Sequence, residues 1–328
     1  MQRITSLLRR FMPALVLSAV SAAPGMALAA YPEQPIKMIV AYAPGGGSDM
    51  IARLTAQYMA KHLGNNASIV VVNRPGAGGG IGFAELSRAP ADGYTIGMIN
   101  TPNVLTIPIE RKVPFHWQDY DLLGNSVDDP DAFSVHTDSQ FATLKDLVAY
   151  AKANPGKVTY GTTGIGSDDH LAGLMLEKAT GIKLTHVPFK GASEVLRAVM
   201  SKEVTVAAMN IGEALAAVKG GNSLRTLGQM SAARTNVAPN VPTFREQGSD
   251  IIRASMRGFA APKGLPAPVR EQLVSALKKT AADPEYQAKA AGYFAPMRYL
   301  EPAAYSAELK ETEADFKQLW RVMPWGEK

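Results

Sequence analysis

The chain has 328 residues and no cysteine, which excludes disulfides, iron–sulfur clusters, cysteine zinc sites and thiol catalysis. Its formal net charge is +5, from 34 Lys and Arg against 29 Asp and Glu. No clustered basic face of the kind that contacts nucleic acid is evident, so nucleic acid is not an expected partner.

The first 29 residues have the parts of an export signal. Arg3, Arg9 and Arg10 give a positive start, residues 11–20 form a short apolar stretch, and residues 27–29 fit the small-residue pattern before a cleavage site. The apolar stretch is too short to span a bilayer comfortably. We therefore predict export, by general secretion rather than the twin-arginine route, with cleavage near Ala29. Without the three arginines of this segment, 31 basic residues face 29 acidic ones.

Apolar runs of strand length then alternate with helical patterns. The expected strands are 36–42, 68–73, 94–100, 133–136, 158–162, 184–189, 204–209, 224–230 and 256–261. The expected helices are 49–62, 81–88, 143–153, 168–180, 192–201, 213–218, 268–281, 284–292 and 303–323. Such alternation is typical of parallel α/β sheets, in which ligands bind beyond the carboxyl ends of the strands.

A first glycine-rich loop follows the strand 36–42 and reads Ala43-Pro44-Gly45-Gly46-Gly47-Ser48-Asp49. Glycine lets a backbone approach a ligand closely, and the free N–H groups at the start of the next helix favour an anion. No Gly-Lys-Ser/Thr follows these glycines, so the lysine of a P-loop is missing, and the chain has no G-x-G-x-x-G pattern, so nucleotide sites are not predicted. The alternative is a plain strand–helix connection capped by Ser48 or Asp49.

A second glycine-rich loop reads Tyr160-Gly161-Thr162-Thr163-Gly164-Ile165-Gly166-Ser167-Asp168-Asp169-His170. Its hydroxyl groups can donate to a carboxylate. Asp168 and Asp169 suit the first helical turn, where capping is the more frequent role. His170 either faces a cleft or packs inside the fold. A metal site at these three residues is not predicted, because ligands on one helix need i, i+3 or i+4 spacing.

Two further segments follow strands. The cluster Gly76-Ala77-Gly78-Gly79-Gly80-Ile81-Gly82 is expected to serve tight turning and close packing. Phe189 can form a pocket wall, Lys190 can add positive charge, and Asn210 can hydrogen-bond a ligand. For Phe189 and Met209, packing in the core is the commoner role.

In their order along the chain, several segments resemble the substrate-binding proteins of tripartite tricarboxylate transporters, the Bug family. The segments are 36–49, 71–79, 91–95, 160–170, 187–191, 241–248 and 258–262. The resemblance covers nearly the whole mature chain. It implies an α/β periplasmic binding-protein fold with two α/β domains, 30–130 plus 254–328 and 131–253, and the ligand cleft between them. The implied hinge crossings lie near 128–131 and 251–254.

The resemblance also implies that a ligand carboxylate is held between the two loops, through backbone amides and bridging water. By position, the implied binding residues are Tyr42, Pro44, Gly46, Gly47, Ser48, Asp49, Thr162, Thr163, Ile165, Gly166, Ser167, His170, Phe189 and Asn210. The family often has tyrosine at the position of Phe189, so one hydroxyl is missing there. No cofactor or metal is expected, and a monomer is sufficient for hinge closure.

The resulting hypothesis is a periplasmic solute-binding protein that closes on a small organic carboxylate and delivers it to the membrane subunits of a tripartite transporter. A ligand-sensing module for a membrane receptor fits the same sequence. A secreted enzyme acting on a carboxylic acid is the alternative from another class, with Asp49 and His170 as its candidate bases. Citrate, dicarboxylates, aromatic carboxylates and acidic amino acids remain open, and Phe189 with Tyr42 and Met209 favours an aromatic ligand.

Overall fold

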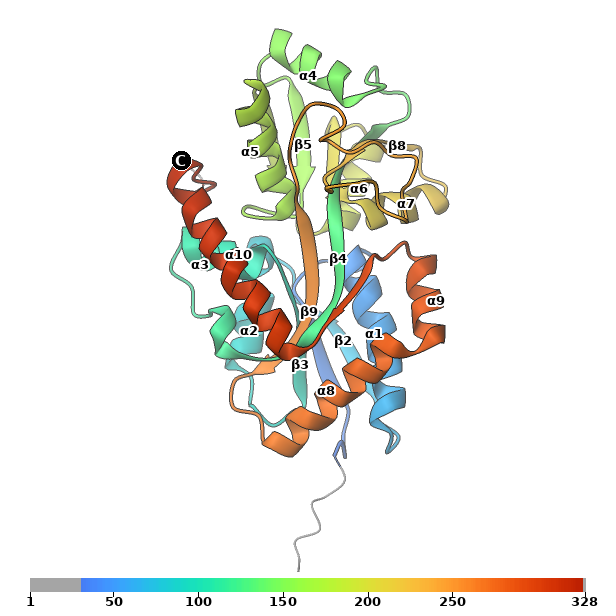
Figure 1. The fold of residues 1–328 in the computed structure, drawn as a ribbon, viewed down its shortest axis with the longest axis vertical. Coiled ribbons are helices and arrows are strands. Elements are labelled where there is room, and N and C mark those ends of the chain that lie inside the picture. The colour runs from blue at the N-terminus through green and yellow to red at the C-terminus, as the bar shows by residue number, and fades with distance from the viewer. Residues whose placement is uncertain (1–30, 327–328) are drawn as a thin grey trace, which may run out of the picture.

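The structure, a computed structural model, describes residues 31–326 of the chain. The expected export signal and its cleavage site near Ala29 lie outside this range. The described chain forms an elongated α/β fold in which helices flank a ten-stranded sheet (Figure 1). No helix within it combines the length and the apolar character needed to cross a membrane.

Strands and helices alternate through most of the chain. The strands are β1 Ile36–Val40, β2 Ile69–Asn73, β3 Thr95–Asn100, β4 Tyr120–His136, β5 Val158–Thr162, β6 Leu184–Pro188, β7 Val206–Asn210, β8 Leu224–Gln229, β9 Ala254–Pro262 and β10 Met297–Leu300. The helices are α1 Gly47–Leu63, α2 Gly80–Arg88, α3 Asn103–Glu110, α4 Leu144–Ala153, α5 Asp168–Thr180, α6 Ala192–Met200, α7 Ile211–Lys219, α8 Ala267–Ala282, α9 Pro284–Gly292 and α10 Pro302–Val322.

The strands fall into two groups that meet at β4. In the first half of the molecule, β1 pairs in parallel with β2 and β3, and β9 lies antiparallel between β3 and the first part of β4. In the second half, β5 pairs in parallel with β6 and β7, and the last part of β4 is antiparallel to β7 and β8. Pro130 of β4 still faces Ala254 of β9, whereas Asp131 faces Asn210 of β7. The long strands β4 and β9 therefore lie where the halves join (Figure 1).

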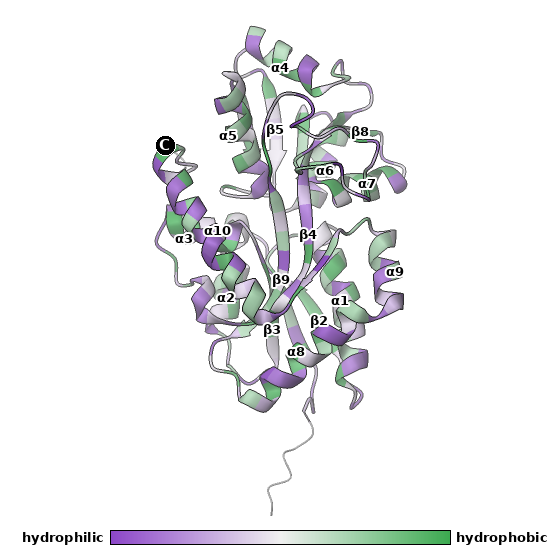
Figure 2. Cartoon of the chain, viewed as in Figure 1, coloured by the Kyte–Doolittle hydropathy of each residue, from purple (hydrophilic) through white to green (hydrophobic). Residues whose placement is uncertain are grey.

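Each half buries apolar side chains on both faces of its strands. In β1, Met38 and Val40 join one cluster with Ile51 of α1, while Ile39 joins another with Phe83 of α2. This alternation follows from the two-residue period of a strand. Helices α4 and α5 cover one face of the second half, and α6 and α7 cover the other. In Figure 2 the helices carry both hydrophobic and hydrophilic residues, as expected for helices with one face on a core.

The structure confirms the expected α/β class and differs from the sequence-based elements in three places. The strand expected at 133–136 is only the end of β4, whose 17 residues include Gly124, Asp128, Asp129 and Pro130. These residues interrupt the apolar pattern that predicts a strand. Helix α3 and the four-residue strand β10 were not expected, because Pro108 interrupts α3 and β10 is too short for a periodic signal.

Candidate ligand-binding site

The first glycine-rich loop leads from β1 into α1 and presents the start of that helix to the second half. Gly46 is the N-cap of α1 and has no side chain to cap the first-turn amides. Such amides lack acceptors within their own helix. The amide of Gly47 donates to Oε1 of Glu213 at 2.8 Å. The N-terminus of α1 therefore binds a carboxylate, as the positive end of a helix favours.

Side chains of the first loop brace it from within the first half. The Asp49 carboxylate accepts hydrogen bonds from the Gly45 amide, from Arg53 and from Asn73. Burial alone would raise the pKa of Asp49, but these hydrogen bonds hold it below its usual range. Ser48 Oγ accepts from Asn100 at 2.8 Å. Asp49 is thus an ionised anchor for the loop, already paired with Arg53.

The second glycine-rich loop is held by its own side chains. The amide and the hydroxyl of Thr163 donate to Asp169, and the amide of Gly166 donates to Nδ1 of His170 at 3.1 Å. Ser167 is the N-cap of α5 and accepts from the His170 amide. Several polar groups expected to face a ligand therefore stabilise the loop itself, and their direct role in carboxylate binding stays a prediction.

His170 packs against a second histidine inside the second half. The rings of His170 and His186 are stacked with centroids 3.9 Å apart, and Nε2 of His186 lies 2.6 Å from Oγ1 of Thr162. Burial, with repulsion from His186, lowers the pKa of His170 to about 3. Burial lowers the pKa of His186 to about 4. Both rings are therefore neutral at pH 7, and His170 is poorly suited to act as a general base.

Replacing His186 with glutamine is expected to reduce the acid sensitivity of the fold. A histidine whose pKa is depressed by folding stabilises the protein fully only above its unfolded pKa of about 6.5. In the wild type this stability is lost as the pH falls towards 4. Between pH 7 and pH 5, the unfolding free energy of the wild type should fall by about 1–2 kcal/mol more than that of H186Q. Urea unfolding at both pH values measures this difference, and equal losses would contradict the neutral histidine pair.

A buried guanidinium lies beside the start of α1. Arg257 of β9 is 2% exposed. It donates to Asp129 at 2.9 Å, to Oδ1 of Asn210 at 3.0 Å and to Glu213 at 3.3 Å. Its Nε has no hydrogen-bond partner in the part of the chain that the structure describes. Burial raises the pKa of Asp129 to about 7, and the nearby Arg257 offsets only part of this rise.

Three further carboxyl groups lie close together next to Asn210. Oxygen atoms of Asp131, Asp168 and Asp169 all lie within 4.8 Å of one another, and all three side chains are buried. Burial and mutual repulsion raise the pKa of Asp131 and of Asp168 well above the usual range, and burial raises that of Asp169 to about 6. Asn210 donates to Oδ2 of Asp168 at 2.7 Å. Burial and mutual repulsion therefore disfavour the ionised form of the carboxyl groups in this cluster.

A small pocket of about 20 Å³ lies between the halves, which is space for about one water molecule. It is lined by Tyr42, Gly46, Gly47, Ser48, Asn100, Asn103, Thr163, Asp168, Ala192, Asn210, Glu213 and Ser255. Six of these were expected from the sequence: Tyr42, Gly46, Gly47, Ser48, Thr163 and Asn210. A neighbouring pocket of about 150 Å³ shares the wall formed by Glu213 and is otherwise largely apolar, with Met50, Leu196 and Met209. Met209 lines this second pocket as well as packing in the core.

The other residues expected from the sequence to bind the ligand do not line the small pocket. Ile165 and Phe189 line a separate open pocket of about 770 Å³, together with Lys190, Arg111 and Trp320. The carbonyl of Pro44 accepts from Ser193 at 2.9 Å across the two halves. Thr162, Gly166, Ser167 and His170 shape the second loop, as described above, and Asp49 braces the first.

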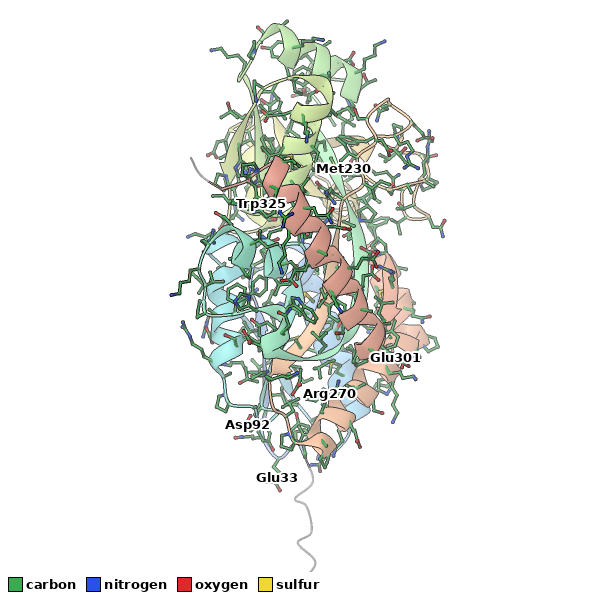
Figure 3. All side chains as sticks on the ribbon, turned by 60° about the vertical axis from the view of Figure 1, so that its left-hand side comes forward. Glu33, Asp92, Met230, Arg270, Glu301 and Trp325 are labelled. Carbon is green, nitrogen blue, oxygen red and sulfur yellow. The ribbon has the colours of Figure 1, made fainter. Side chains whose placement is uncertain are left out.

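The halves touch closely at several points besides Glu213. A Cβ atom on Gly164 of the second loop would lie 2.8 Å from Cα of Gly78, which supports the close-packing role expected for the third glycine cluster. Thr106 donates to the carbonyl of Gly166 at 2.7 Å. The C-terminal segment also reaches this region: in Figure 3, Trp325 lies beyond the end of α10 beside the second half, where it is 2% exposed.

Two residues of the site, Arg257 and Glu213, were not predicted from the sequence. Arg257 stands within the apolar run expected as the strand 256–261, and an isolated charge in a buried strand could have indicated a polar site. Glu213 follows Asn210 by three residues and completes a capping box at the start of α7. That pattern predicts only a helix start. It carries no information about Gly47, which lies 166 positions away in the sequence.

Comparisons with known proteins give the same fold and a family. The family model described as tripartite tricarboxylate transporter family receptor matches residues 51–297. A UPF0065 protein of Cupriavidus necator is 32% identical over 86% of this chain and 85% of its own length. The solved periplasmic binding protein BugD is 30% identical, with a TM-score of 0.84 over 91% of this chain and all of its own.

A more distant structure shares the fold. R. palustris Rpa4515, solved with adipate, is 24% identical with a TM-score of 0.84 over 89% of this chain and 98% of its own. The periplasmic binding-protein fold expected from the sequence is thereby confirmed, as is the resemblance to the Bug proteins. The chain therefore belongs to the tripartite tricarboxylate transporter receptor family, whose members are periplasmic solute-binding proteins and not enzymes.

Proposed function

We propose that this protein captures a small organic carboxylate between its two halves and delivers it to the membrane subunits of a tripartite transporter. One observation carries the proposal: a carboxylate, that of Glu213, already accepts from the Gly47 amide at 2.8 Å and from Arg257 at 3.3 Å. A helix N-terminus and a guanidinium are both groups that select carboxylates. The adipate with which Rpa4515 was solved belongs to the same ligand class.

The capture step is proposed to be a hinge motion. The domains would be residues 30–130 plus 254–328 and residues 131–253, with crossings near 128–131 and 251–254. The change of partner in β4, between Pro130 and Asp131, supports these boundaries. A pocket of about 20 Å³ has no room for a dicarboxylate. The halves must therefore separate before a ligand can enter, and the ligand favours closure through its higher affinity for the closed form.

The free energy of binding cannot come from the helix end alone. The start of α1 contributes about 0.3–1 kcal/mol and at most about 2 kcal/mol, whereas micromolar binding needs about 8 kcal/mol. A charged hydrogen bond to Arg257 adds about 1.5–3 kcal/mol. The walls of the pocket must supply most of the remainder, so residues such as Met50, Leu196 and Met209 would set the preference for the body of the acid.

The same geometry argues against chemistry on the bound acid. Of the two candidate bases, Asp49 is paired with Arg53 in the first half, and His170 is stacked on His186 in the second. Both are occupied in holding their loops, which suits a receptor that binds and releases its ligand unchanged. We propose that it does so as a periplasmic monomer, after the signal is cleaved near Ala29.

Thermal unfolding of the purified protein with mono-, di- and tricarboxylates, both aliphatic and aromatic, tests this function. A ligand that binds only the folded state stabilises it by about 2.7 kcal/mol at one hundred times its Kd. We expect at least one acid to raise the unfolding midpoint. The same acid with every carboxyl group converted to a methyl ester should have no effect. If only sugars or amines raised the midpoint, carboxylate capture would be wrong.

A further inference from the structure

Glu213 already fills part of the proposed site. Its Oε1 accepts from the amide of Gly47, at the start of α1, and its Oε2 accepts from the amide of Asn210, at the start of α7. One carboxylate thus joins helix N-termini from both halves. Its side chain is buried to about nine-tenths, with 9% exposed. The Glu213 carboxylate therefore lies where the proposed function places the carboxylate of the ligand, and it has the same chemistry.

Arg257 is the second partner of this carboxylate and has donor capacity to spare. Its side chain is 2% exposed, and its Nε finds no acceptor in the described part of the chain. Nη2 reaches the start of α1: a Cβ atom on Gly47 would lie 2.8 Å from it. A buried guanidinium with an unsatisfied N–H costs free energy. An incoming carboxylate that binds in the bidentate manner typical of arginine can satisfy that N–H.

Glu213 also separates two pockets. It lines the small polar pocket beside Asn210 and the largely apolar pocket of about 150 Å³ beside Met209. The walls of both pockets include Gly46, Gly47 and Ala192. A turn of the Glu213 side chain away from Gly47 would therefore join the two spaces and leave the α1 amide and Arg257 facing them.

We propose that Arg257 binds the ligand carboxylate and that Glu213 is a resident carboxylate which occupies this position until the ligand displaces it. The inference rests on the proposed function of carboxylate capture. The contact between Glu213 and Gly47 stabilises a closed form that competes with the ligand, so it lowers the apparent affinity. Glu213 thereby sets a minimum affinity for the ligand: only an acid that binds Gly47 and Arg257 better than Glu213 does can occupy the site.

Glu213→Gln tests the proposal, because glutamine keeps the size of the side chain and removes its charge. Glu194→Gln is the matched control. Glu194 occupies the same third position of helix α6 and accepts from the Lys190 amide at 3.0 Å, but no hydrogen bond or ion pair joins it to α1 within the described residues. Calorimetric titration with adipate at fixed ionic strength gives the affinities. Small-angle X-ray scattering without added acid gives the radius of gyration.

We expect E213Q to bind adipate at least about tenfold more tightly than the wild type, and to have a larger radius without acid. E194Q should match the wild type in both measurements. Equal or weaker binding of adipate by E213Q would overturn the proposal, and so would an unchanged radius. If no carboxylate from the thermal screen bound either protein, the proposed function itself would fail, and the radius alone would then decide whether Glu213 joins the halves.

Discussion

Replacing Gly47 with alanine is expected to weaken carboxylate binding by at least about tenfold, equivalent to about 1.4 kcal/mol. A Cβ atom at this position would lie 2.6 Å from Oε1 of Glu213 and 2.8 Å from Nη2 of Arg257. Such distances are too short for any carboxylate that approaches the α1 amide. Glu213 and Arg257 must shift to make room for the new methyl group, and the higher helix propensity of alanine, about 1 kcal/mol, offsets part of that cost in stability.

The neighbouring glycine provides the control for this prediction. A Cβ atom on Gly46 would lie 3.6 Å from the nearest atoms of Ala192, an ordinary contact. Gly46→Ala should therefore keep the wild-type affinity within about twofold, equivalent to about 0.4 kcal/mol. Calorimetric titration gives the affinities, and urea unfolding gives the stabilities. Equal affinity in the two variants would mean that the ligand does not approach Gly47.

Replacing Arg257 with methionine is expected to lower the unfolding free energy at pH 8 by about 3 kcal/mol. The guanidinium is buried and paired with Asp129 and Glu213, and removing one member of a buried pair leaves an uncompensated charge, at a cost of about 3–5 kcal/mol. Burial already raises the pKa of Asp129 to about 7. Without Arg257, protonation of Asp129 at lower pH should recover part of the loss.

A surface arginine in β10, the strand that pairs with the first part of β4, gives the comparison. Arg298 pairs with Asp128, the neighbour of Asp129, and with Glu308, but its side chain is 41% exposed. Arg298→Met should cost no more than about 1 kcal/mol, as is usual for exposed ion pairs. Urea unfolding of both variants at pH 8 and pH 6 measures the contrast. Similar losses in the two variants would show that the burial of Arg257 has no energetic consequence.

The sequence predicts those parts of the site that depend on local pattern. Gly46, Gly47 and Ser48 follow a strand and open a helix, and Thr163 lies in a second loop of the same kind. Strand ends of parallel sheets are where ligands bind, which predicts a ligand-facing position for each loop, whereas the resemblance to the Bug family implied that the two loops hold one carboxylate between them. The order of elements followed from the same alternation of apolar runs and helical patterns.

The parts that could not be predicted depend on contacts between distant segments. Arg257 meets Glu213 across 44 positions of sequence and Asp129 across 128. Neither residue has a local pattern that names its partner. The first part of β4 was missed for a related reason: Asp128 and Asp129 make it polar, and it is stabilised as a strand by pairing with β9. The charged centre of the site and the strand that holds it are thus both products of tertiary structure.

The most direct test of carboxylate capture is a crystal structure of the protein with the acid that raises its unfolding midpoint most. We predict that a carboxylate oxygen of the acid lies about 3 Å from the Gly47 amide nitrogen, with Arg257 as its second partner and Glu213 turned away. An acid bound instead in the open pocket beside Phe189 and Trp320, with Glu213 still on the Gly47 amide, would contradict the account.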